Sequence, residues 1–411
     1  MYEIMSADEA IRLIRDGDCI CVNSFVGIEN PTELHEALYR RYQKMQSPTH
    51  LTIVSSAGFG VWDDEHNAEG YIREGAVDKL ICGHFGAMMS TKKLVLEDRF
   101  EAYNLPLGCI SHAIRAQAGG LPGALSKVGL DIFVDPRREG PGINRISIDD
   151  SLVKHVEVDG DEFLYYKLPK ITIAMIKGTA ADRKGNITFD DMFMSGDALS
   201  ICQAVKANRG KVIVQVDRLV ATPSRPRNAI IPGCLVDAIV VAEPQERNEA
   251  YTALTGSFEI PYKEWHTWNE KINDLSQKQR KNNIPANIIG KRAAQELRVD
   301  DIVNIGIGIP ETVARFARKS GMLDMITLTV ESGGIGGFPV SGEAFGAMIG
   351  AASVYDMANQ FDLYDNGGLD VCFMGALEVD KYGNINAHRG TGKAPGNGTG
   401  SGLGIKCKNT S

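Results

Sequence analysis

Residues 326–340 read I-T-L-T-V-E-S-G-G-I-G-G-F-P-V, and the pattern changes at Glu331. Ile326, Leu328 and Val330 alternate with two threonines, which is the period of a β-strand. After Glu331 come a serine and then four glycines within five residues. The stretch therefore predicts a strand that ends in a carboxylate, followed by a loop with little side-chain bulk. Loops at strand ends often display reactive groups.

Glu331 has two interpretations at this point. A carboxylate that is stripped of water and oriented by its site can be a covalent nucleophile, and glycines let a backbone or a large ligand come close. Alternatively, Glu331 is an ordinary strand-end residue before a flexible turn. The local sequence alone favours this second interpretation, and the rest of the chain shifts the balance toward the first.

The composition is that of a globular protein with more than one domain. A chain of 411 residues is too long for one average domain, so two or three are expected. The net charge of −8 and the pI near 5.6 argue against nucleic-acid binding through a basic face. Residues 1–16 contain no signal-peptide core, and no apolar run approaches the roughly 18 residues that a membrane span needs. We therefore expect no membrane association.

Cysteine and histidine usage predicts a reduced protein without a metal site. The eight cysteines are scattered, without a C-x-x-C pair, which fits buried thiols and a cytoplasmic location. The eight histidines show no metal-ligand spacing, and we favour a structural role for His84. The motif D-x-x-G-N-I, which occurs at Asp182 and Asp380, could suggest a metal. A tight turn between strands explains its Gly and Asn equally well, and its double occurrence favours the turn.

Three segments recur in the same order, which predicts an internal duplication. The matched pairs are residues 10–18 with 293–301, residues 51–60 with 328–337, and residues 181–188 with 379–386. Each copy alternates strands and helices, so the predicted fold class is α/β, with two tandem related domains and largely parallel sheets. In this alignment Val54 stands where the other copy has Glu331, which indicates that one copy has specialised.

The repeat and the composition together predict domain boundaries. Residues 1–245 form an N-terminal domain, and residues 288–387 form a C-terminal domain that carries Glu331. Residues 246–287 are polar and aperiodic, which is typical of a linker. Residues 388–411 are glycine-rich and cannot bury enough surface to become ordered. Because the first copy continues well beyond its G-N-I-T motif with strands and a helix, the second domain is predicted to be incomplete.

The loop with Gly306 and Gly308 follows a predicted strand and precedes a predicted helix, which invites a dinucleotide-binding interpretation. The third glycine of that motif would fall on Glu311, and Pro310 interrupts the pattern, so this signal is weak. The loop could still hold a phosphate, such as those of coenzyme A, through exposed backbone N–H groups.

Several motifs resemble those of the family I coenzyme A transferases, and most of all the single-chain acetate/propionate CoA-transferases. The motifs are F-V-G-I-E-N-P from Phe25, C-G-H-F-G from Cys82, A-Y-N-L-P-L-G from Ala102, F-V-D-P-R from Phe133, I-P-G-C-L-V-D from Ile231, V-N-I-G-I-G-I-P from Val303, E-S-G-G-I-G-G from Glu331 and G-G-L-D-V-C-F-M-G-A-L-E-V-D from Gly367. They stand in the family's order, and the resemblance covers nearly the whole chain up to about Asn386.

The resemblance implies roles for particular residues. Glu331 would be the nucleophile that attacks an acyl-CoA, giving an acyl-glutamyl anhydride and then a glutamyl-CoA thioester. The CoA site would be lined by Val303, Asn304, Ile305, Gly306, Ile307 and Gly308. Candidates for the oxyanion loop are Gly333, Gly334, Gly396 and Gly398. The family usually has Gln at the position of Leu107, near the active site, so a polar contact is expected to be lost here.

The predicted function is therefore transfer of coenzyme A, with ping-pong kinetics, between a short-chain acyl-CoA (acetyl-, propionyl- or similar) and a free carboxylate. Coenzyme A is then a substrate, and no cofactor is predicted. An acyl-CoA hydrolase and an inactive acyl-CoA-binding fragment of the family are the alternatives. The expected partners are acyl-CoA and a short-chain carboxylate, without nucleic acid or membrane, and the resemblance implies a homo-oligomer.

Overall fold

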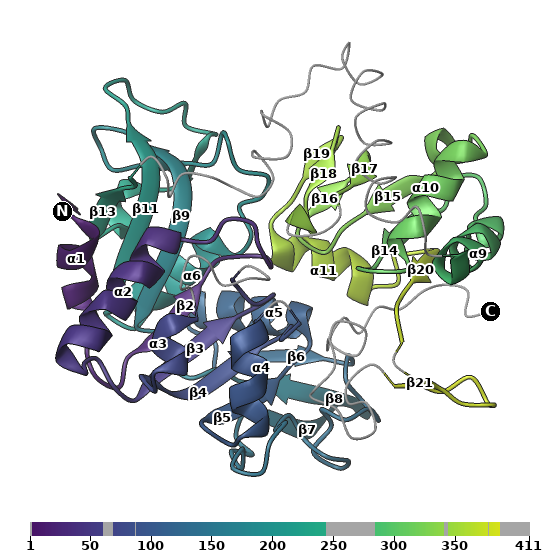
Figure 1. Ribbon diagram of the computed structural model, residues 1–411, viewed down its shortest axis with the longest axis horizontal. Coiled ribbons are helices and arrows are strands. Elements are labelled where there is room, and N and C mark those ends of the chain that lie inside the picture. Colours follow the sequence, from purple (N-terminus) through teal and green to yellow (C-terminus); the bar gives the residue numbers. More distant parts are fainter. Residues whose placement is uncertain are drawn as a thin grey trace.

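The computed structural model describes residues 2–60, 69–86, 88–243, 284–340, 344–376 and 378–386. We call residues 2–243 the first half of the chain and residues 284–386 the second half. Each half has its own main β-sheet, and the two halves lie side by side (Figure 1). Residues 246–283 of the predicted linker and the predicted tail 388–411, with Gly396 and Gly398, lie outside the described residues.

The main sheet of the first half is parallel, with the strand order β1-β13-β11-β9-β2-β3-β4-β5. Its strands are β1 (Glu3–Ile4), β2 (Cys19–Val22), β3 (Leu51–Ser55), β4 (Val77–Cys82), β5 (Glu101–Asn104), β9 (Ile173–Ala181), β11 (Lys211–Leu219) and β13 (Ala238–Val241). The short strand β10 (Ile187–Thr188) pairs antiparallel with β9, and β12 (Ala229–Ile231) pairs antiparallel with β10. All nine residues of β9 are buried, as expected for a parallel sheet that is covered on both faces.

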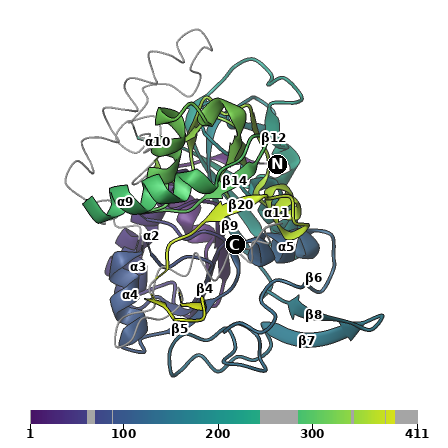
Figure 2. The same cartoon turned by 90° about the vertical axis from the view of Figure 1, so that its right-hand side faces the viewer.

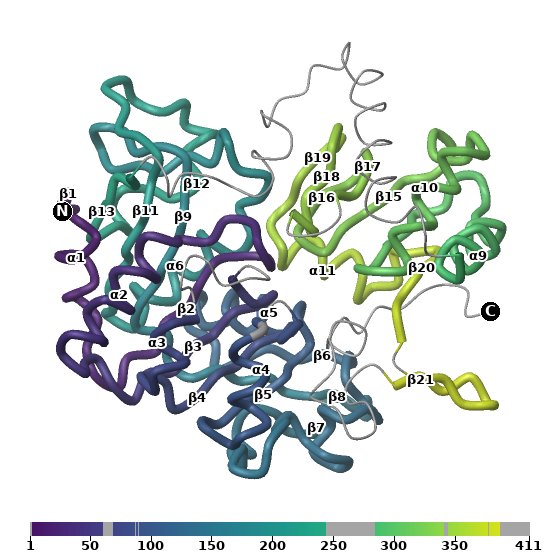
Figure 3. The backbone as a smooth tube through the Cα atoms, viewed as in Figure 1, coloured from purple at the N-terminus to yellow at the C-terminus, as the bar shows by residue number. Residues whose placement is uncertain are grey.

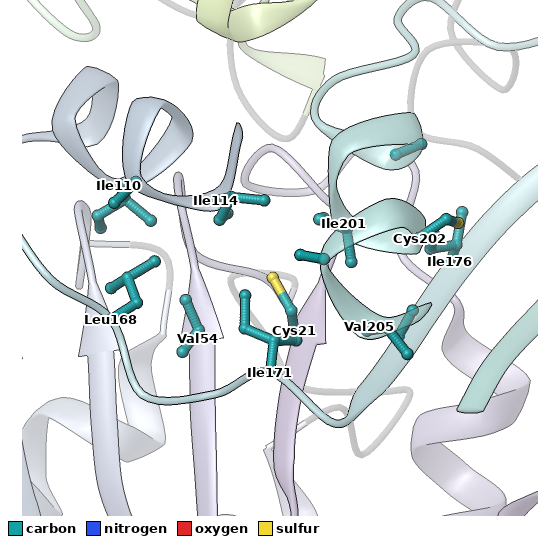
Figure 4. Close-up of a cluster of buried hydrophobic side chains, with 14 of the residues drawn as sticks. Cys21, Val54, Ile110, Ile114, Leu168, Ile171, Ile176, Ile201, Cys202 and Val205 are labelled. Atoms are coloured by element: carbon teal, nitrogen blue, oxygen red, sulfur yellow. The ribbon is translucent and has the colours of Figure 1, made fainter. Parts of the chain in front are cut away.

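Helices cover both faces of this sheet. The helices are α1 (Ala7–Ala10), α2 (Thr32–Met45), α3 (Gly70–Arg73) and α4 (Met89–Leu96) on one face, and α5 (Leu107–Ala118) and α6 (Ala198–Ala207) on the other. Figure 4 shows Ile114 of α5 and Ile201 of α6 packed over Cys21 and Val54 of the sheet. A small antiparallel sheet of β6 (Ala124–Ser126), β7 (Val153–Val158) and β8 (Asp161–Tyr166) lies beside α5.

The main sheet of the second half is smaller and mixed, with the order β19-β16-β15-β14-β20. Its strands are β14 (Ile302–Ile305), β15 (Thr327–Thr329), β16 (Gly334–Ile335), β19 (Ser353–Val354) and β20 (Val371–Phe373). Two further antiparallel pairs form separate sheets: β17 (Phe338–Pro339) with β18 (Met348–Ile349), and β21 (Glu378–Val379) with β22 (Ile385–Asn386). β14 pairs in parallel with β15 and β20, whereas β16 pairs antiparallel with β15 and β19. The chain is thus α/β with one mostly parallel sheet and one mixed sheet.

Among the described residues, the second half has three α-helices. They are α9 (Ile284–Ala293), α10 (Glu311–Lys319) and α11 (Met357–Asp365). Figures 1 and 2 show α9 and α10 on the side that is turned away from the first half, whereas α11 faces it. Because α9 begins at Ile284, residues 284–287, which the sequence assigned to the linker, are helical. The incompleteness of the second domain stays a prediction.

The strand pairing supports the predicted duplication but corrects one of its alignments. β2 lies between β9 and β3, and its counterpart β14 lies between β20 and β15, all in parallel. Cys21 pairs with Val54, whereas its counterpart Asn304 pairs with Thr329. The counterpart of Val54 is therefore Thr329, and that of Glu331 is Ser56. The sequence alignment was wrong by two residues, a shift that leaves every strand side chain on the same face and so preserves the hydrophobic pattern.

The two halves meet along α5 and α11, which Figure 3 traces side by side at the boundary. A Cβ atom on Gly108 of α5 would lie 2.4 Å from the ring of Phe361 on α11, so the helices touch at this glycine. Beside this contact, Arg115 donates to both carboxylate oxygens of Asp362, each at 3.1 Å. A third hydrophobic cluster contains side chains from both halves, including Phe25 and Phe345.

Candidate active site

Glu331 follows directly after β15 and opens a tight turn. The N–H of Gly333 donates to the carbonyl oxygen of Val330 (3.2 Å), and the N–H of Val330 donates to that of Gly334 (3.0 Å). The chain then returns as β16 beside β15. The predicted open loop is therefore a turn followed by a short strand. Glu331 itself is buried, with 3% of its surface exposed.

The glycines after Glu331 are closely packed. Gly333 has φ +115°, and a Cβ atom there would lie 1.9 Å from the carbonyl oxygen of Tyr355. A Cβ atom on Gly334 would lie 2.8 Å from the ring of Phe193 and from the sulfur of Met348. The sequence allowed these glycines to admit either a protein backbone or a large ligand. In the structure, neighbouring protein segments approach them closely. They do not leave open space around Glu331.

The environment of Glu331 suits a carboxyl group that titrates near neutral pH. Burial raises its pKa to about 7, and hydrogen bonds from its own backbone N–H and from the side chain of Asn304 partly oppose that rise. Within the described residues, the Oε2 atom of Glu331 has no hydrogen-bond partner. The group can therefore be ionised near pH 7 while one oxygen keeps its lone pairs available, which is what a carboxylate nucleophile needs.

A buried group of polar side chains lies next to Glu331. Tyr364 of α11 donates from its hydroxyl to Oγ1 of Thr329 (2.8 Å) and accepts from the amides of Gln360 (2.8 Å) and Asn304 (3.3 Å). The charge of Glu331 acts on Tyr364, whose pKa is raised mainly by burial. Thr329 was not predicted as part of the site, although a threonine two positions before Glu331 on a buried strand shares its face. No sequence signal pointed to Tyr364 on a helix far along the chain.

The predicted CoA-binding stretch is divided between core and surface. Val303, Asn304 and Ile305 form most of β14 and are buried. The N–H of Gly306 donates to the carbonyl oxygen of Phe373 (2.9 Å). Only Ile307 and Gly308, of the six predicted residues, are partly exposed.

The loop that was expected to hold a phosphate carries a carboxylate of its own. The N–H of Gly308 donates to Oε1 of Glu311 (2.9 Å), the residue in the place of the third glycine of a dinucleotide-binding motif. A phosphate that used this N–H would have to displace Glu311. Likewise, the N–H of Gly333, a predicted oxyanion donor, is directed at Val330. The roles of these residues stay predictions.

The first half supplies part of the surroundings of Glu331. Ser332 donates to the carbonyl oxygen of Gly346, and a Cβ atom on Gly346 would lie 2.4 Å from the ring of Phe25. Phe193 packs against Gly334 in the same way. Leu107, at the position where the resemblance leads one to expect Gln, is buried within the hydrophobic cluster that joins the halves. Its side chain therefore packs there without a polar contact.

Another buried carboxyl group, that of Asp197, lies beside the equivalent place in the first half. Asp197 accepts hydrogen bonds at Oδ2 from Ser56, the counterpart of Glu331, and from Ser111, both at 2.7 Å. Burial raises the pKa of Asp197 to about 6, against the effect of the two serines. The adjoining Gly196 accepts a hydrogen bond from the N–H of Met357 at the start of α11 (3.2 Å). This carboxyl group is thus part of the contact between the halves.

Other site types find little support in the described part of the chain. There, no group of three or more His, Cys, Asp or Glu side chains is arranged to hold a metal ion. Oδ1 of Asp182 accepts from the N–H groups of Lys184 and Asn186, and Oδ1 of Asp380 accepts in the same way, which confirms the predicted tight turns. Helices that combine the length and the apolar character of a membrane span do not occur among the described residues.

Comparison with known proteins identifies the family. Residues 4–242 and 286–400 match the Coenzyme A transferase family. The chain is 38% identical over 400 residues to acetate CoA-transferase YdiF of Escherichia coli K12, which covers 96% of this chain and 73% of that protein. It is 36% identical to caffeate CoA-transferase of Acetobacterium woodii, over 95% of this chain and 73% of that protein. The chain belongs to the coenzyme A transferase family.

Structural comparison agrees with this assignment. The crystal structure of the acyl-CoA transferase YdiF from E. coli O157:H7, in a thioester complex with CoA, matches with a TM-score of 0.84 at 34% identity. That match covers 98% of this chain and 74% of the crystallised chain. A putative citrate lyase α subunit from Streptococcus mutans matches with a TM-score of 0.53 at 16% identity, which is a likeness of fold alone.

Proposed function

We propose that this protein transfers coenzyme A between a short-chain acyl-CoA and a free carboxylate through a covalent thioester on Glu331. The observation that carries this proposal is the buried carboxyl group of Glu331 at the end of β15. Its pKa lies near 7, and its Oε2 atom has no hydrogen-bond partner among the described residues. An ionised, desolvated carboxylate at neutral pH is a competent nucleophile.

In the first half-reaction, Oε2 of Glu331 attacks the thioester carbonyl carbon of the acyl-CoA. The C–S bond breaks, and the products are an acyl-glutamyl anhydride and the CoA thiolate. The thiolate then attacks the glutamyl carbonyl carbon, and the acyl group leaves as a free carboxylate. The enzyme is left as a glutamyl-CoA thioester, and no proton or electron is gained or lost overall.

In the second half-reaction, an incoming carboxylate attacks the glutamyl thioester carbonyl and expels the CoA thiolate. The thiolate attacks the acyl carbonyl of the new anhydride, which releases the new acyl-CoA and restores the Glu331 carboxylate. Both anhydride steps pass through an oxyanion that needs donors. Gly334, Gly396 and Gly398 are our candidates for that role, since the N–H of Gly333 is already directed at Val330.

The comparisons support the class of chemistry. The similar enzymes from E. coli and A. woodii are an acetate and a caffeate CoA-transferase, so their names agree on CoA transfer and differ in the acid. The similar E. coli O157:H7 enzyme was crystallised as a thioester complex with CoA. We propose acetyl-CoA, propionyl-CoA or a similar short acyl-CoA as the donor, coenzyme A as a substrate with no further cofactor, a cytoplasmic location and a homo-oligomeric state.

Intact-protein mass spectrometry after incubation with acetyl-CoA tests the thioester. We expect a mass increase corresponding to CoA on the wild-type protein and none on Glu331→Gln. Asp197→Asn is the matched control, because it also neutralises one buried carboxyl group but leaves Glu331 in place. An adduct that persists in Glu331→Gln, or no adduct on folded wild-type protein that binds CoA, would contradict the proposal.

A hydrolase would use the same carboxylate and differ only in the final acceptor. Loss of acetyl-CoA should therefore be measured with and without a carboxylate acceptor such as propionate. We expect turnover to require the acceptor. Equal rates in its absence would identify hydrolysis as the reaction.

A further inference from the structure

The turn that carries Glu331 is held by a segment of the second half, residues 353–357, which leads into α11. Strand β16 begins at Gly334 and pairs antiparallel with β19 of this segment. The N–H of Tyr355 then donates to the carbonyl oxygen of Gly333 (2.9 Å). A Cβ atom on Gly333 would lie 1.9 Å from the carbonyl oxygen of Tyr355, so the two backbones are in direct contact. The position of the turn therefore depends on the position of Tyr355.

The first half of the chain holds the same segment immediately after Tyr355. Oγ of Ser195 donates to Oδ1 of Asp356 (2.5 Å), and the N–H of Met357 donates to the carbonyl oxygen of Gly196 (3.2 Å). We call these two hydrogen bonds the loop contact. A hydrogen bond to a carboxylate is of the stronger, charge-assisted kind. Because the two hydrogen bonds join neighbouring residues on both sides, they fix the direction of the segment as well as its place.

The start of α11 is therefore capped by the other half of the chain. Asp356 is the N-cap residue of α11, and its side chain makes no capping hydrogen bond to the helix. Its carboxylate accepts from Ser195 instead. The first N–H groups of a helix have no partner within the helix, and the carbonyl oxygen of Gly196 supplies one to Met357. The residues that adjoin Tyr355 thus depend on the first half for their hydrogen bonds.

The first-half side of the loop contact is itself firmly held. Asn23 follows directly after β2, and its side-chain amide donates to the carbonyl oxygen of Ser195 (3.3 Å). The side-chain oxygen of Asn23 accepts from the N–H of Asp197 (2.9 Å). A Cβ atom on Gly196 would lie 2.6 Å from that same oxygen, so the loop is closely packed on Asn23. A group that is supported in this way can hold a neighbour in a precise position.

We infer that Ser195 of the first half is a positioning residue for the Glu331 turn. It acts through Asp356, whose neighbour Tyr355 contacts the turn directly. A planar peptide bond joins Tyr355 to Asp356, so a displacement of one residue is passed on to the other. The inference rests on the proposed function of Glu331 as the reacting group, but the arrangement itself can be tested without turnover.

The consequence for Glu331 is both electrostatic and geometric. If the hydrogen bond from Ser195 is lost, the segment around Tyr355 moves away from the turn and water reaches the carboxyl group. Burial is the main cause of the raised pKa of Glu331, so a carboxyl group in contact with water has a lower pKa. A displaced carboxylate also attacks a bound thioester more slowly, because a shift of about 1 Å can cost about 100-fold in rate.

The first test is the titration of Glu331 in Ser195→Ala, followed by infrared difference spectroscopy with Glu331→Gln as the subtraction reference. Ser195→Ala removes a hydrogen bond without changing a charge, whereas Asp356→Ala would also remove a charge that raises the pKa of Asp197. We expect the apparent pKa of Glu331 to fall by about one unit toward 4.5, because the carboxyl group becomes more exposed.

Two further variants show whether the hydroxyl of Ser195 is responsible. Ser195→Thr keeps the hydroxyl and should give the wild-type titration. Ser151→Ala is the matched control, because it removes a similar hydrogen bond, to Oδ1 of Asp149 (2.6 Å), that lies within the first half. It should leave the titration of Glu331 unchanged. A Ser195→Ala titration that superimposes on wild type would overturn the inference, and so would an equal shift in Ser195→Thr.

The rate of CoA adduct formation at a pH well above the pKa separates position from ionisation, because Glu331 is then ionised in wild type and variant alike. We expect Ser195→Ala to lower this rate about tenfold. If wild-type protein forms no adduct but the infrared titration of Ser195→Ala still shifts, the thioester mechanism fails and the positioning role stands. If Ser195→Ala forms the adduct at the wild-type rate with an unshifted titration, the positioning role fails alone.

Discussion

The protonation of Glu331 links its proposed reactivity to the stability of the fold. Its pKa is raised from 4.5 to about 7, so the folded state binds a proton that the unfolded state releases between these values. The stabilising contribution is complete below pH 4.5 and is lost as the pH rises through 7. At neutral pH the protein therefore holds a carboxylate at a cost to its stability.

Glu331→Gln should remove this cost. We expect the variant to match wild type in free energy of unfolding at pH 4.5 and to exceed it above pH 7 by up to about 3 kcal/mol. Urea denaturation at a series of pH values measures this difference. If the difference in free energy of unfolding between Glu331→Gln and wild type is the same at every pH, burial does not raise the pKa of Glu331.

Gly333 should tolerate no side chain. Its φ of +115° and the carbonyl oxygen of Tyr355 at 1.9 Å from a built Cβ both oppose alanine, and Gly333→Ala should cost at least about 3 kcal/mol of stability. Gly321→Ala is the control, because Gly321 also has a positive φ (+76°) but nothing within 4 Å of its Cβ position. It should cost only about 1 kcal/mol. If thermal or urea denaturation shows equal losses of stability in Gly333→Ala and Gly321→Ala, the positive φ alone accounts for the loss and the contact with Tyr355 adds nothing.

At the scale of the elements, α5 and α11 set the distance between the two halves. The contact of Gly108 with the ring of Phe361 leaves no room for a larger residue. The nearby pair of Arg115 and Asp362 is about half exposed, and such ion pairs contribute little to stability. The close approach of the helices, and not the ion pair, should therefore hold α11 and its Tyr364 in place.

Gly108→Val should separate the two helices. We expect a loss of about 2–3 kcal/mol in the free energy of unfolding, because a valine side chain has no room against Phe361. Arg115→Ala, the matched change on the same helix, should cost less than about 1 kcal/mol. The measurement is urea denaturation. A larger effect of Arg115→Ala would show that the ion pair dominates this interface.

Much of the element pattern could be predicted from the sequence. The strand before Glu331 lies where the alternation indicates, and the tight turns at Asp182 and Asp380 form where the D-x-x-G-N-I motif predicts them. These features depend on neighbours within a few residues, so local chemistry determines them. The duplication was recognised in the same way, from motifs that recur in order.

The register of the repeat and the surroundings of Glu331 could not be predicted in this way. A shift of two residues leaves the alternation of a strand intact, so the sequence could not choose between Val54 and Ser56 as the counterpart of Glu331. Tyr364 lies near Glu331 only because α11 packs against β14 and β15, a long-range contact without a local signal. The glycines after Glu331 were visible, but what packs against them was not.

At the scale of the whole molecule, two buried carboxyl groups shape the pH dependence of stability. The pKa of Asp197 is raised from 3.8 to about 6, so its stabilising contribution is complete below pH 3.8 and is lost as the pH rises through 6. The stabilising contribution of Glu331 is lost over a pH range that lies about one unit higher. Together they lower the free energy of unfolding between about pH 4 and pH 7. The buried His35 and His84 act in the opposite direction, because burial lowers their pKa values to about 3 and about 4 and their contribution grows as the pH rises toward 6.5.

Asp197→Asn should gain stability relative to wild type as the pH rises from 4 to 6, because an amide can still accept from Ser56 and Ser111 without a charge. The double variant with Glu331→Gln should gain further relative to wild type up to about pH 7. Urea denaturation between pH 4 and pH 8 measures both differences. A double variant whose stability differs from wild type by the same amount at every pH would contradict the prediction.

The surroundings of Glu331 also have a consequence for how the protein folds. Phe25 and Phe193 pack against the second half beside the Glu331 turn, although both are synthesised long before it. Contacts between segments so distant in the chain form late, because the loops that join them must close first. On refolding from urea, the far-ultraviolet circular dichroism signal should therefore return before the capacity to form the CoA adduct. During synthesis, likewise, the chain would carry no competent carboxylate until its two halves have docked.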